Sequence, residues 1–331
     1  AMKKIFLHIG QGKTGTTFLQ NTLASNSAEL NNSNFCYPNG SAEGKIQSGN
    51  IPDMARFGFA YLTSILENEV TNNQFDNIIF SCEFLSGLFN KNIPDLINLF
   101  NLFKTKGIEI HLVICIRDVN SHCKSLFSQN IKAGFYNFDN SIEDFLLKSY
   151  DAPQATLKIL KTCQAFAIPC HAFKYDKNDL LRDFSTAIGL DFELNAHSQG
   201  MINRSLSTNE LMILSAFQHF PPQKLRNLTW ALVELVPNLH SHKYKCDEST
   251  ATRFAQQIDP VIDQINQIVT TNNQIPNINI SELTAGDELQ TLTDSQIKVI
   301  HGWINSNYKL KLSWKLRLKR LVKSIVYFQN K

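Results

Sequence analysis

Residues 4–20 read KIFLHIGQGKTGTTFLQ, and this stretch decides the fold. An apolar run is followed by a loop with three glycines, Gly10, Gly12 and Gly15, and then by apolar residues at helical spacing. A strand, a glycine-rich loop and a helix in this order expose backbone N–H groups at a helix N-terminus, where anions bind. The pattern therefore predicts a phosphate- or sulfate-binding loop at the start of an α/β domain.

Further β-like runs follow along the chain, separated by helical patterns. They cover residues 77–81 (NIIFS), residues 108–116 (IEIHLVICI) and, more briefly, residues 170–173. Alternation of strands and helices is typical of a parallel sheet covered on both faces. We therefore predict a P-loop-like three-layer α/β/α sandwich over about residues 1–200.

The rest of the chain is expected to be mainly helical. Helical periodicity without a convincing strand predicts helices over about residues 201–290, packed beside the sheet in one domain of residues 1–290. Residues 291–331 form a tail that carries eight lysines and arginines and no acid from Tyr308 onward. This basic amphipathic tail could lie on an anionic membrane surface, hold an acidic glycan or pack on the core.

Composition narrows the class of protein. The 331 residues carry a net charge of only +3, which argues against nucleic acid as a partner, so an anion site must be local. The seven cysteines form no CxxC pair, so neither a zinc site nor a disulfide framework is expected, and a reduced cytoplasm fits best. No segment approaches the roughly 20 apolar residues that span a bilayer. We expect a cytoplasmic protein, with peripheral contact to the inner face of the membrane through the basic tail as the alternative.

The loop differs from the phosphate loop of ATPases and GTPases. Gly10 and Gly15 have the Walker A spacing, but Thr16 stands where the lysine should be, and the lysine lies inside the loop as Lys13. Asp118 is the one contender for a magnesium-binding acid at a neighbouring strand end. A P-loop kinase with a rearranged lysine and a non-catalytic nucleotide-binding module remain as alternatives.

The KTGTT sequence after the first strand resembles the sulfotransferase family that uses 3′-phosphoadenosine 5′-phosphosulfate (PAPS), most closely its bacterial glycan and heparan-sulfate types. The resemblance extends to FCYP at residues 35–38, FSCE at residues 80–83 and the pair Tyr175 and Asp176. Better-known members have a proline where Gly12 stands. The resemblance implies that PAPS is held at its 5′ end by Gly12, Lys13, Thr14, Gly15, Thr16 and Thr17.

A second anion grip is predicted at the end of the longest strand. Arg117 follows this strand directly, and its planar guanidinium suits the 3′-phosphate that distinguishes PAPS from ATP. Ser125 lies eight residues later, about two helical turns on, as in sulfotransferases. A salt bridge with Asp118 or a plain surface charge is the alternative for Arg117, and an ordinary polar position on a helix surface is the alternative for Ser125. Asn203 and Arg204 are a weaker candidate for a third contact, because the family's glycine is missing there.

Sulfuryl transfer needs a base, an aligned hydroxyl and positive charge on the leaving phosphate. Lys13 is the expected charge, and Glu83, just past the second strand, is the expected base, as in polysaccharide-type sulfotransferases. A carboxylate that only favours the next helix N-terminus is the alternative for Glu83, and His122 is a reserve base. The resemblance implies a carbohydrate or glycolipid acceptor, adenosine 3′,5′-bisphosphate as product and no metal.

Overall fold

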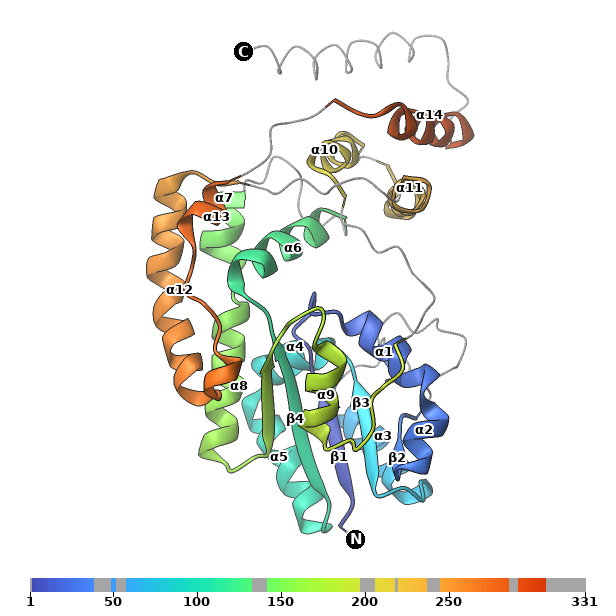
Figure 1. Ribbon diagram of the computed structural model, residues 1–331, viewed down its shortest axis with the longest axis vertical. Coiled ribbons are helices and arrows are strands. Elements are labelled where there is room, and N and C mark those ends of the chain that lie inside the picture. Colours follow the sequence, from blue (N-terminus) through green and yellow to red (C-terminus); the bar gives the residue numbers. More distant parts are fainter. Residues whose placement is uncertain are drawn as a thin grey trace. The chain divides into compact units, whose positions relative to one another are not determined.

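The structure is a computed structural model of the whole chain, and it falls into two compact units (Figure 1). The first unit comprises Ala1–His122, Tyr150–Gly200 and Thr252–Asn279, and the second comprises Cys123–Ser149, Met201–Ala251 and Ile280–Lys331. Each unit is described by itself. The structure describes residues 2–38, 49–51, 58–132, 142–196, 206–217, 220–236, 245–285 and 291–307.

A five-stranded, all-parallel sheet forms the centre of the first unit and confirms the predicted α/β class. The strand order is β2-β3-β1-β4-β5, so the first strand lies in the middle. Leu7 of this strand is in register with Phe80 on one side and Leu112 on the other, and all three are fully buried. The strands are β1 Lys4–His8, β2 Phe35–Cys36, β3 Asn77–Ser81, β4 Glu109–Ile116 and β5 Cys170–Lys174.

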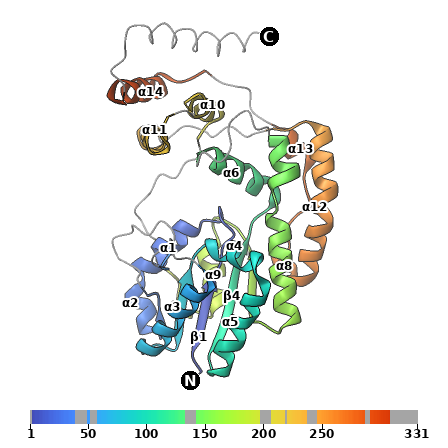
Figure 2. The same ribbon diagram turned by 180° about the vertical axis from the view of Figure 1, so that it is seen from behind.

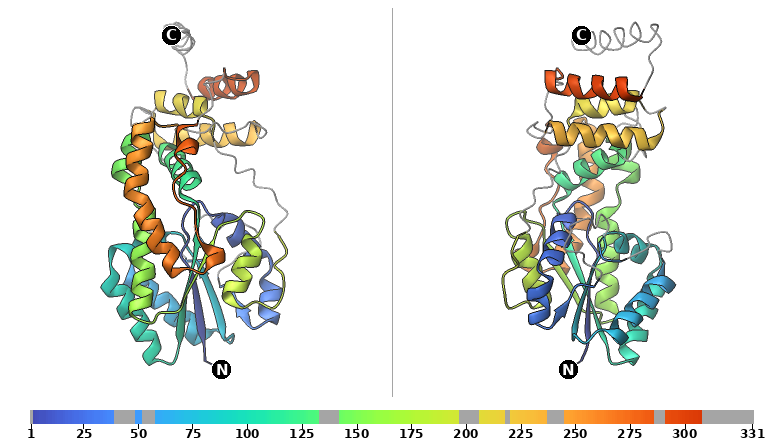
Figure 3. Two further views of the ribbon diagram at one scale, coloured as in Figure 1. Left: turned by 60° about the vertical axis from the view of Figure 1, so that its left-hand side comes forward. Right: turned by 90° about the vertical axis from the view of Figure 1, so that its right-hand side faces the viewer.

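Helices cover both faces of this sheet (Figures 2 and 3). One face is covered by α1 Thr16–Ser25, α2 Ser27–Asn32 and α9 Leu180–Ile188, and the other by α3 Phe59–Asn72, α4 Phe84–Lys91, α5 Ile93–Thr105 and α8 Ala152–Ala165. Buried Leu19 and Leu23 of α1 and Phe184 of α9 pack with Phe6 and Val113 of the strands in one apolar cluster. The layers place the carboxyl ends of β1, β3 and β4 side by side, which is what positions the site.

The remaining described segments of the second unit are helical, as expected for the C-terminal part of the chain. Trp303 packs against Phe217 and Phe220, and its Nε1–H donates to the Lys224 carbonyl at 3.1 Å. Residues 308–331, most of the predicted basic tail, lie outside the described residues. The helices of this unit are α7 Ile142–Asp144, the π-helix Phe145–Ser149, α10 Thr208–Ala216, α11 Pro222–Leu235, α13 Ile280–Thr284 and α14 Asp294–Asn307.

Two helices pass from one unit to the other. Helix α6, Val119–Lys132, begins in the first unit, and α12, Glu248–Ile268, ends in it, followed by the 3₁₀ turn Thr271–Asn273. The chain thus returns to the sheet after the helices of the second unit. Within the described part of the chain, no helix has the length and apolar character needed to cross a membrane.

Candidate functional site

The glycine-rich loop lies between β1 and α1 and is tied to β4. Gln11 N–H donates to the Cys115 carbonyl at 2.9 Å, and Cys115 N–H donates to the Gly10 carbonyl at 2.8 Å, so the pairing of β1 with β4 continues into the loop. The Thr14 hydroxyl donates to the Gln11 carbonyl at 2.6 Å and closes the loop on itself. The loop therefore has a defined shape and directs the first amides of α1 toward the carboxyl ends of the strands.

Gly15 is required where this loop enters α1. Its φ of 72° lies in the left-handed region, and a Cβ there would come within 2.8 Å of Leu180 Cδ2 and 3.3 Å of Tyr175 Cε2. Any larger residue would meet both strain and a collision. The glycine allows α9 and the β5–α9 connection to pack directly against the start of α1.

Lys13 occupies the centre of the loop and is half-buried. Its φ of 66° is unusual for a residue with a side chain. Burial lowers the pKa of the Lys13 ammonium, the negative charge of Glu83 opposes that shift, and the positive charge of Arg117 adds to it. Both charged residues selected from the sequence thus act electrostatically on Lys13 in this structure.

Glu83 follows β3 and contacts the other side of the loop. Cys82 N–H donates to the His8 carbonyl at 2.9 Å, so β3 stays paired with β1 up to the residue before Glu83. Glu83 Oε2 accepts a hydrogen bond from the Thr16 hydroxyl at 3.0 Å and lies 3.7 Å from where a Cβ of Gly12 would be. Its side chain makes no capping hydrogen bond to its own helix α4. The carboxylate therefore faces the loop and the start of α1.

Arg117 follows β4, and its guanidinium is directed at the same loop. Nη1 donates to the Lys13 carbonyl at 2.7 Å, Nε donates to the Ser121 hydroxyl at 2.8 Å, and the guanidinium carbon lies 5.4 Å from the centre of the Tyr175 ring. The loop and the arginine, selected separately from the sequence, are thus in direct contact. The cation is held by contacts from a loop carbonyl, a helix hydroxyl and an aromatic face.

The serine that contacts Arg117 is Ser121, one helical turn along α6. Asp118 holds it, since Ser121 N–H donates to Asp118 Oδ1 at 2.8 Å and the Ser121 hydroxyl donates to Asp118 Oδ2. Ser125, selected for its spacing, is half-buried further along α6, among the residues of the second unit. Sequence reasoning missed Ser121, which lies four residues after Arg117 and near the start of α6.

The His122 ring makes a hydrogen bond to the loop, a role that was not predicted from the sequence. Its Nε2–H donates to the Gly12 carbonyl at 2.9 Å, so Nδ1 is the acceptor for the Tyr150 hydroxyl at 2.8 Å. Burial lowers the pKa of His122 to about 4, so the ring is neutral near pH 7. This reserve base is therefore occupied on both nitrogens by the loop and by Tyr150.

The other selected residues have these positions. Thr14, Gly15, Thr16 and Thr17 lie in the loop and the first turn of α1, beside Gly12 and Lys13. Asn203 and Arg204 lie outside the described residues. In the described residues no group of three or more histidines, cysteines or acids is arranged to hold a metal ion.

Comparisons with known proteins identify no family for this chain. No family model matches it, and no curated protein matches it in sequence. A solved structure from a study of the PezAT chromosomal toxin-antitoxin system of Streptococcus pneumoniae aligns with 68% of this chain and 87% of that chain, at 13% sequence identity and a TM-score of 0.28. Similarity at this level assigns no activity, so the function has to be argued from the site.

Proposed function

We propose that this protein transfers a sulfuryl group from PAPS to a hydroxyl of a carbohydrate or glycolipid acceptor. The observation that carries the proposal is the 2.7 Å hydrogen bond from Arg117 to the Lys13 carbonyl, which sets a planar cation beside a lysine-containing phosphate loop. A nucleotide with phosphates on both its 5′ and 3′ positions needs two such cationic grips. ATP and GTP lack the 3′-phosphate, so the second grip favours PAPS.

Each group at the strand ends has a role in this reaction. The loop amides, Thr16 and Thr17 would bind the 5′-phosphosulfate, and Lys13 would stabilise the negative charge that develops on the leaving phosphate. Glu83 would accept the proton of the acceptor hydroxyl as the bond from its oxygen to sulfur forms and the bond from sulfur to the phosphate oxygen breaks. The products would be a sulfate ester and adenosine 3′,5′-bisphosphate.

Arg117 would bind the 3′-phosphate. Of its five N–H groups, one on Nε donates to Ser121 and one on Nη1 donates to Lys13. The others can pair with phosphate oxygens, and the Tyr175 ring limits the orientations of the guanidinium. A preorganised guanidinium loses less entropy on binding than a mobile one, which favours tight binding of the bisphosphate.

A specific contact supports a second candidate function, phosphoryl transfer from ATP. The Thr16 hydroxyl and the Glu83 carboxylate lie 3.0 Å apart, and a hydroxyl with a carboxylate is a pair of oxygen ligands that magnesium accepts beside a phosphate. On this hypothesis Glu83 would be bound to the metal when ATP is present. Binding of ATP that requires magnesium distinguishes this candidate from the first.

Calorimetry separates the two candidates without knowledge of the acceptor. The full chain is titrated with adenosine 3′,5′-bisphosphate, with ADP, and with ATP in the presence and absence of magnesium. We expect the bisphosphate to bind at least tenfold more tightly than ADP, with no effect of magnesium. Tighter binding of magnesium-ATP than of the bisphosphate would refute the sulfotransferase proposal in favour of the kinase.

A variant of Arg117 tests the second grip. Arg117→Ala should weaken adenosine 3′,5′-bisphosphate by about 30- to 100-fold and adenosine 5′-phosphate much less, because the 3′-phosphate contact is lost only for the first, while the lost hydrogen bond to the Lys13 carbonyl affects both. Arg182→Ala removes an exposed arginine of α9 that pairs with Asp179 and Asp183, and it serves as the matched control. If Arg117→Ala lowered the affinities for both nucleotides equally, Arg117 would not be the residue that binds the 3′-phosphate.

A further inference from the structure

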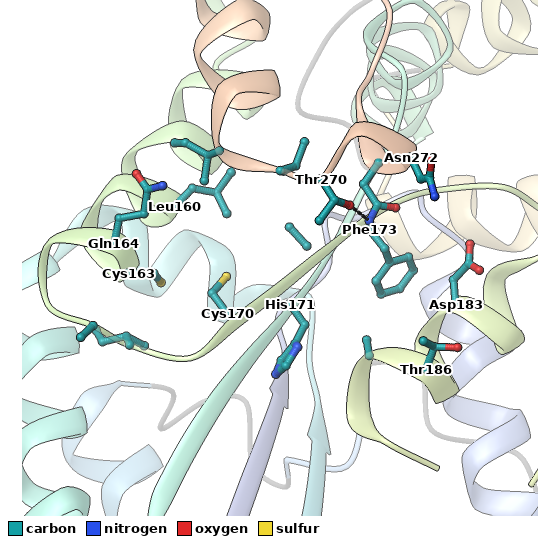
Figure 4. Close-up of a pocket in the computed structure, with 17 residues that line it drawn as sticks. Leu160, Cys163, Gln164, Cys170, His171, Phe173, Asp183, Thr186, Thr270 and Asn272 are labelled. Atoms are coloured by element: carbon teal, nitrogen blue, oxygen red, sulfur yellow. Dashed lines mark hydrogen bonds between the residues drawn. The ribbon is translucent and has the colours of Figure 1, made fainter. Parts of the chain in front are cut away.

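A second feature of the first unit lies away from the strand ends, along the outer edge of β5 (Figure 4). It is a pocket of about 740 Å³ between α8, β5, α9 and the segment that follows α12. Its described lining includes one acid, Asp183, and no lysine or arginine. The remaining lining is apolar or neutral and contains two thiols, from Cys163 and Cys170. The pocket therefore suits a small polar molecule better than a phosphate.

The two thiols are neighbours. The Cys163 side chain acts on the Cys170 thiol, and both side chains line the same pocket. Cys163 is the less exposed, with 3% of its surface accessible, and Cys170 is half-buried. Both side chains are visible at the same end of the pocket in Figure 4. A small molecule in the pocket therefore lies beside the pair of sulfurs.

The backbone on both sides holds this pair in place. Helix α8 ends in a turn in which Ile168 N–H donates to the Cys163 carbonyl at 2.9 Å and Ala167 takes the left-handed conformation, with φ of 50°. Strand β5 begins at Cys170, two residues after Ile168. A hydrogen bond from Leu112 N–H to the Pro169 carbonyl, at 2.8 Å, sets the position of this strand. The closeness of the two thiols thus follows from how α8 turns into β5.

We propose that Cys163 and Cys170 are a dithiol that reacts with low-molecular-weight disulfides in this pocket and closes to a disulfide. In the first step the Cys163 thiolate attacks one sulfur of the small disulfide, which forms a mixed disulfide and releases one small thiol. In the second step Cys170 loses its proton and attacks the Cys163 sulfur, and the second small thiol leaves. The protein loses two electrons and two protons, and the small disulfide gains them as two thiols.

The interaction between the two thiols also assigns the order of the two steps. The interaction with Cys163 and burial both raise the pKa of Cys170 well above its usual value, so Cys170 keeps its proton near neutral pH. Cys163 is therefore assigned as the thiol that attacks first. Proximity makes the second step fast, because the attacking sulfur is already beside its target.

Cys36 is a matched control within the same chain. It is half-buried like Cys170, and the contact made by its sulfur is with the side-chain amide of Asn73, at 3.0 Å. Burial raises the pKa of the Cys36 thiol as well. Cys36 therefore has similar exposure but no adjacent thiol among the described residues, so any reaction with a small disulfide should stop at the mixed disulfide.

The test is treatment of the full chain with oxidised glutathione, followed by peptide mapping under non-reducing conditions. We expect a linked Cys163–Cys170 peptide that forms at least tenfold faster than any glutathione adduct at Cys36, with loss of two of the seven thiols that returns on reduction. Cys170→Ser should retain glutathione on Cys163, Cys163→Ser should abolish the linkage, and Cys36→Ser should leave the linkage unchanged.

Other results would overturn the proposal. A wild-type chain that forms no Cys163–Cys170 link, while Cys36 reacts, would show that the pair is not a reactive dithiol. A Cys170→Ser chain that carries no glutathione on Cys163 would contradict the assigned order. These measurements use no nucleotide, so they are independent of the proposed function at the strand ends.

Discussion

The carboxyl ends of β1, β3 and β4 and the outer edge of β5 belong to one sheet but have opposite chemical character. At the strand ends, Lys13, Glu83 and Arg117 come from three different strand–helix connections and act on one loop. At the edge, a pocket of about 740 Å³ is lined mostly by neutral groups. The comparison shows that a pocket can lie away from the place where charged groups converge, because the size of a cavity and the convergence of charged groups are independent properties.

The physical reason lies in the parallel sheet. Each strand of a parallel sheet leads into a helix at the same end, so helix N-termini and the side chains after the strands converge there. Side chains do not converge in this way along the outer edge of β5, where backbone N–H and C=O groups of an edge strand face a pocket. One of those groups is already covered, because Lys174 N–H donates to the Asn273 side-chain oxygen at 3.1 Å.

The largest expected effect is on sulfuryl transfer, and it compares one carboxylate of each region, Glu83 at the strand ends and Asp183 in the pocket. Glu83→Gln should lower sulfuryl transfer by about 10³-fold, or about 4 kcal/mol, and leave donor affinity within about twofold, because the base is lost while the loop remains. Asp183→Asn makes the same chemical change in the pocket and should leave transfer unchanged. The measurements are turnover of PAPS with a hydroxyl acceptor and donor affinity by calorimetry. Undiminished transfer by Glu83→Gln would show that Glu83 is not the base. The carboxylates of the two regions would then not differ in their effect on transfer.

The second-largest expected effect is on the pH dependence of stability, and it concerns two buried histidines, His122 and His8. Burial lowers the pKa of both His122 and His8 from 6.5 to about 4. Between these pH values the unfolded chain binds protons that the folded chain does not, so stability is complete above pH 6.5 and falls as the pH decreases toward 4. The loss should reach roughly 3 kcal/mol for each histidine. It is measured as the urea midpoint at a series of pH values.

Variants identify the source of this pH dependence. His122→Gln should reduce the slope by the contribution of its own ring, while His8 and His171, whose pKa values burial also lowers, retain theirs. Tyr150→Phe removes only the hydroxyl that donates to His122 and should retain the slope, since burial is the main cause of the lowered pKa. A wild-type midpoint that does not change between pH 6.5 and 4 would contradict the burial of neutral rings at this site.

The smallest expected effect compares two glycines with nearly the same backbone conformation. Gly15 in the loop and Gly107 before β4 have φ of 72° and 71°, but a Cβ collides with Leu180 in the first case and meets nothing within 4 Å in the second. Gly107→Ala should cost only the backbone term of about 1 kcal/mol. Gly15→Ala should cost about 2 kcal/mol more, measured by urea unfolding. Equal costs would mean that α9 is not packed tightly against the loop.

Much of the sheet followed from local pattern. β1, β3 and β4 contain continuous apolar runs between glycine, proline or polar residues, and such runs indicate buried parallel strands. β5 reads CHAFK and was predicted only as a short strand. β2 was not predicted as a strand, because Phe35 and Cys36 are too few for any periodicity to be seen. The division of residues 201–290 between two compact units was not predicted either, since helical periodicity does not specify which core a helix joins.

The sequence by itself determined the kinds of groups at the strand ends. Lys13, Glu83 and Arg117 each stand just after a strand, and parallel strands bring such residues to one edge. Their distant partners depend on the tertiary structure: Tyr175 for Arg117, Thr16 for Glu83, and His122 for Gly12. Position after a strand depends on the local chain, but a hydrogen bond between residues about 70 or 110 apart depends on how helices pack on the sheet, which no local pattern encodes.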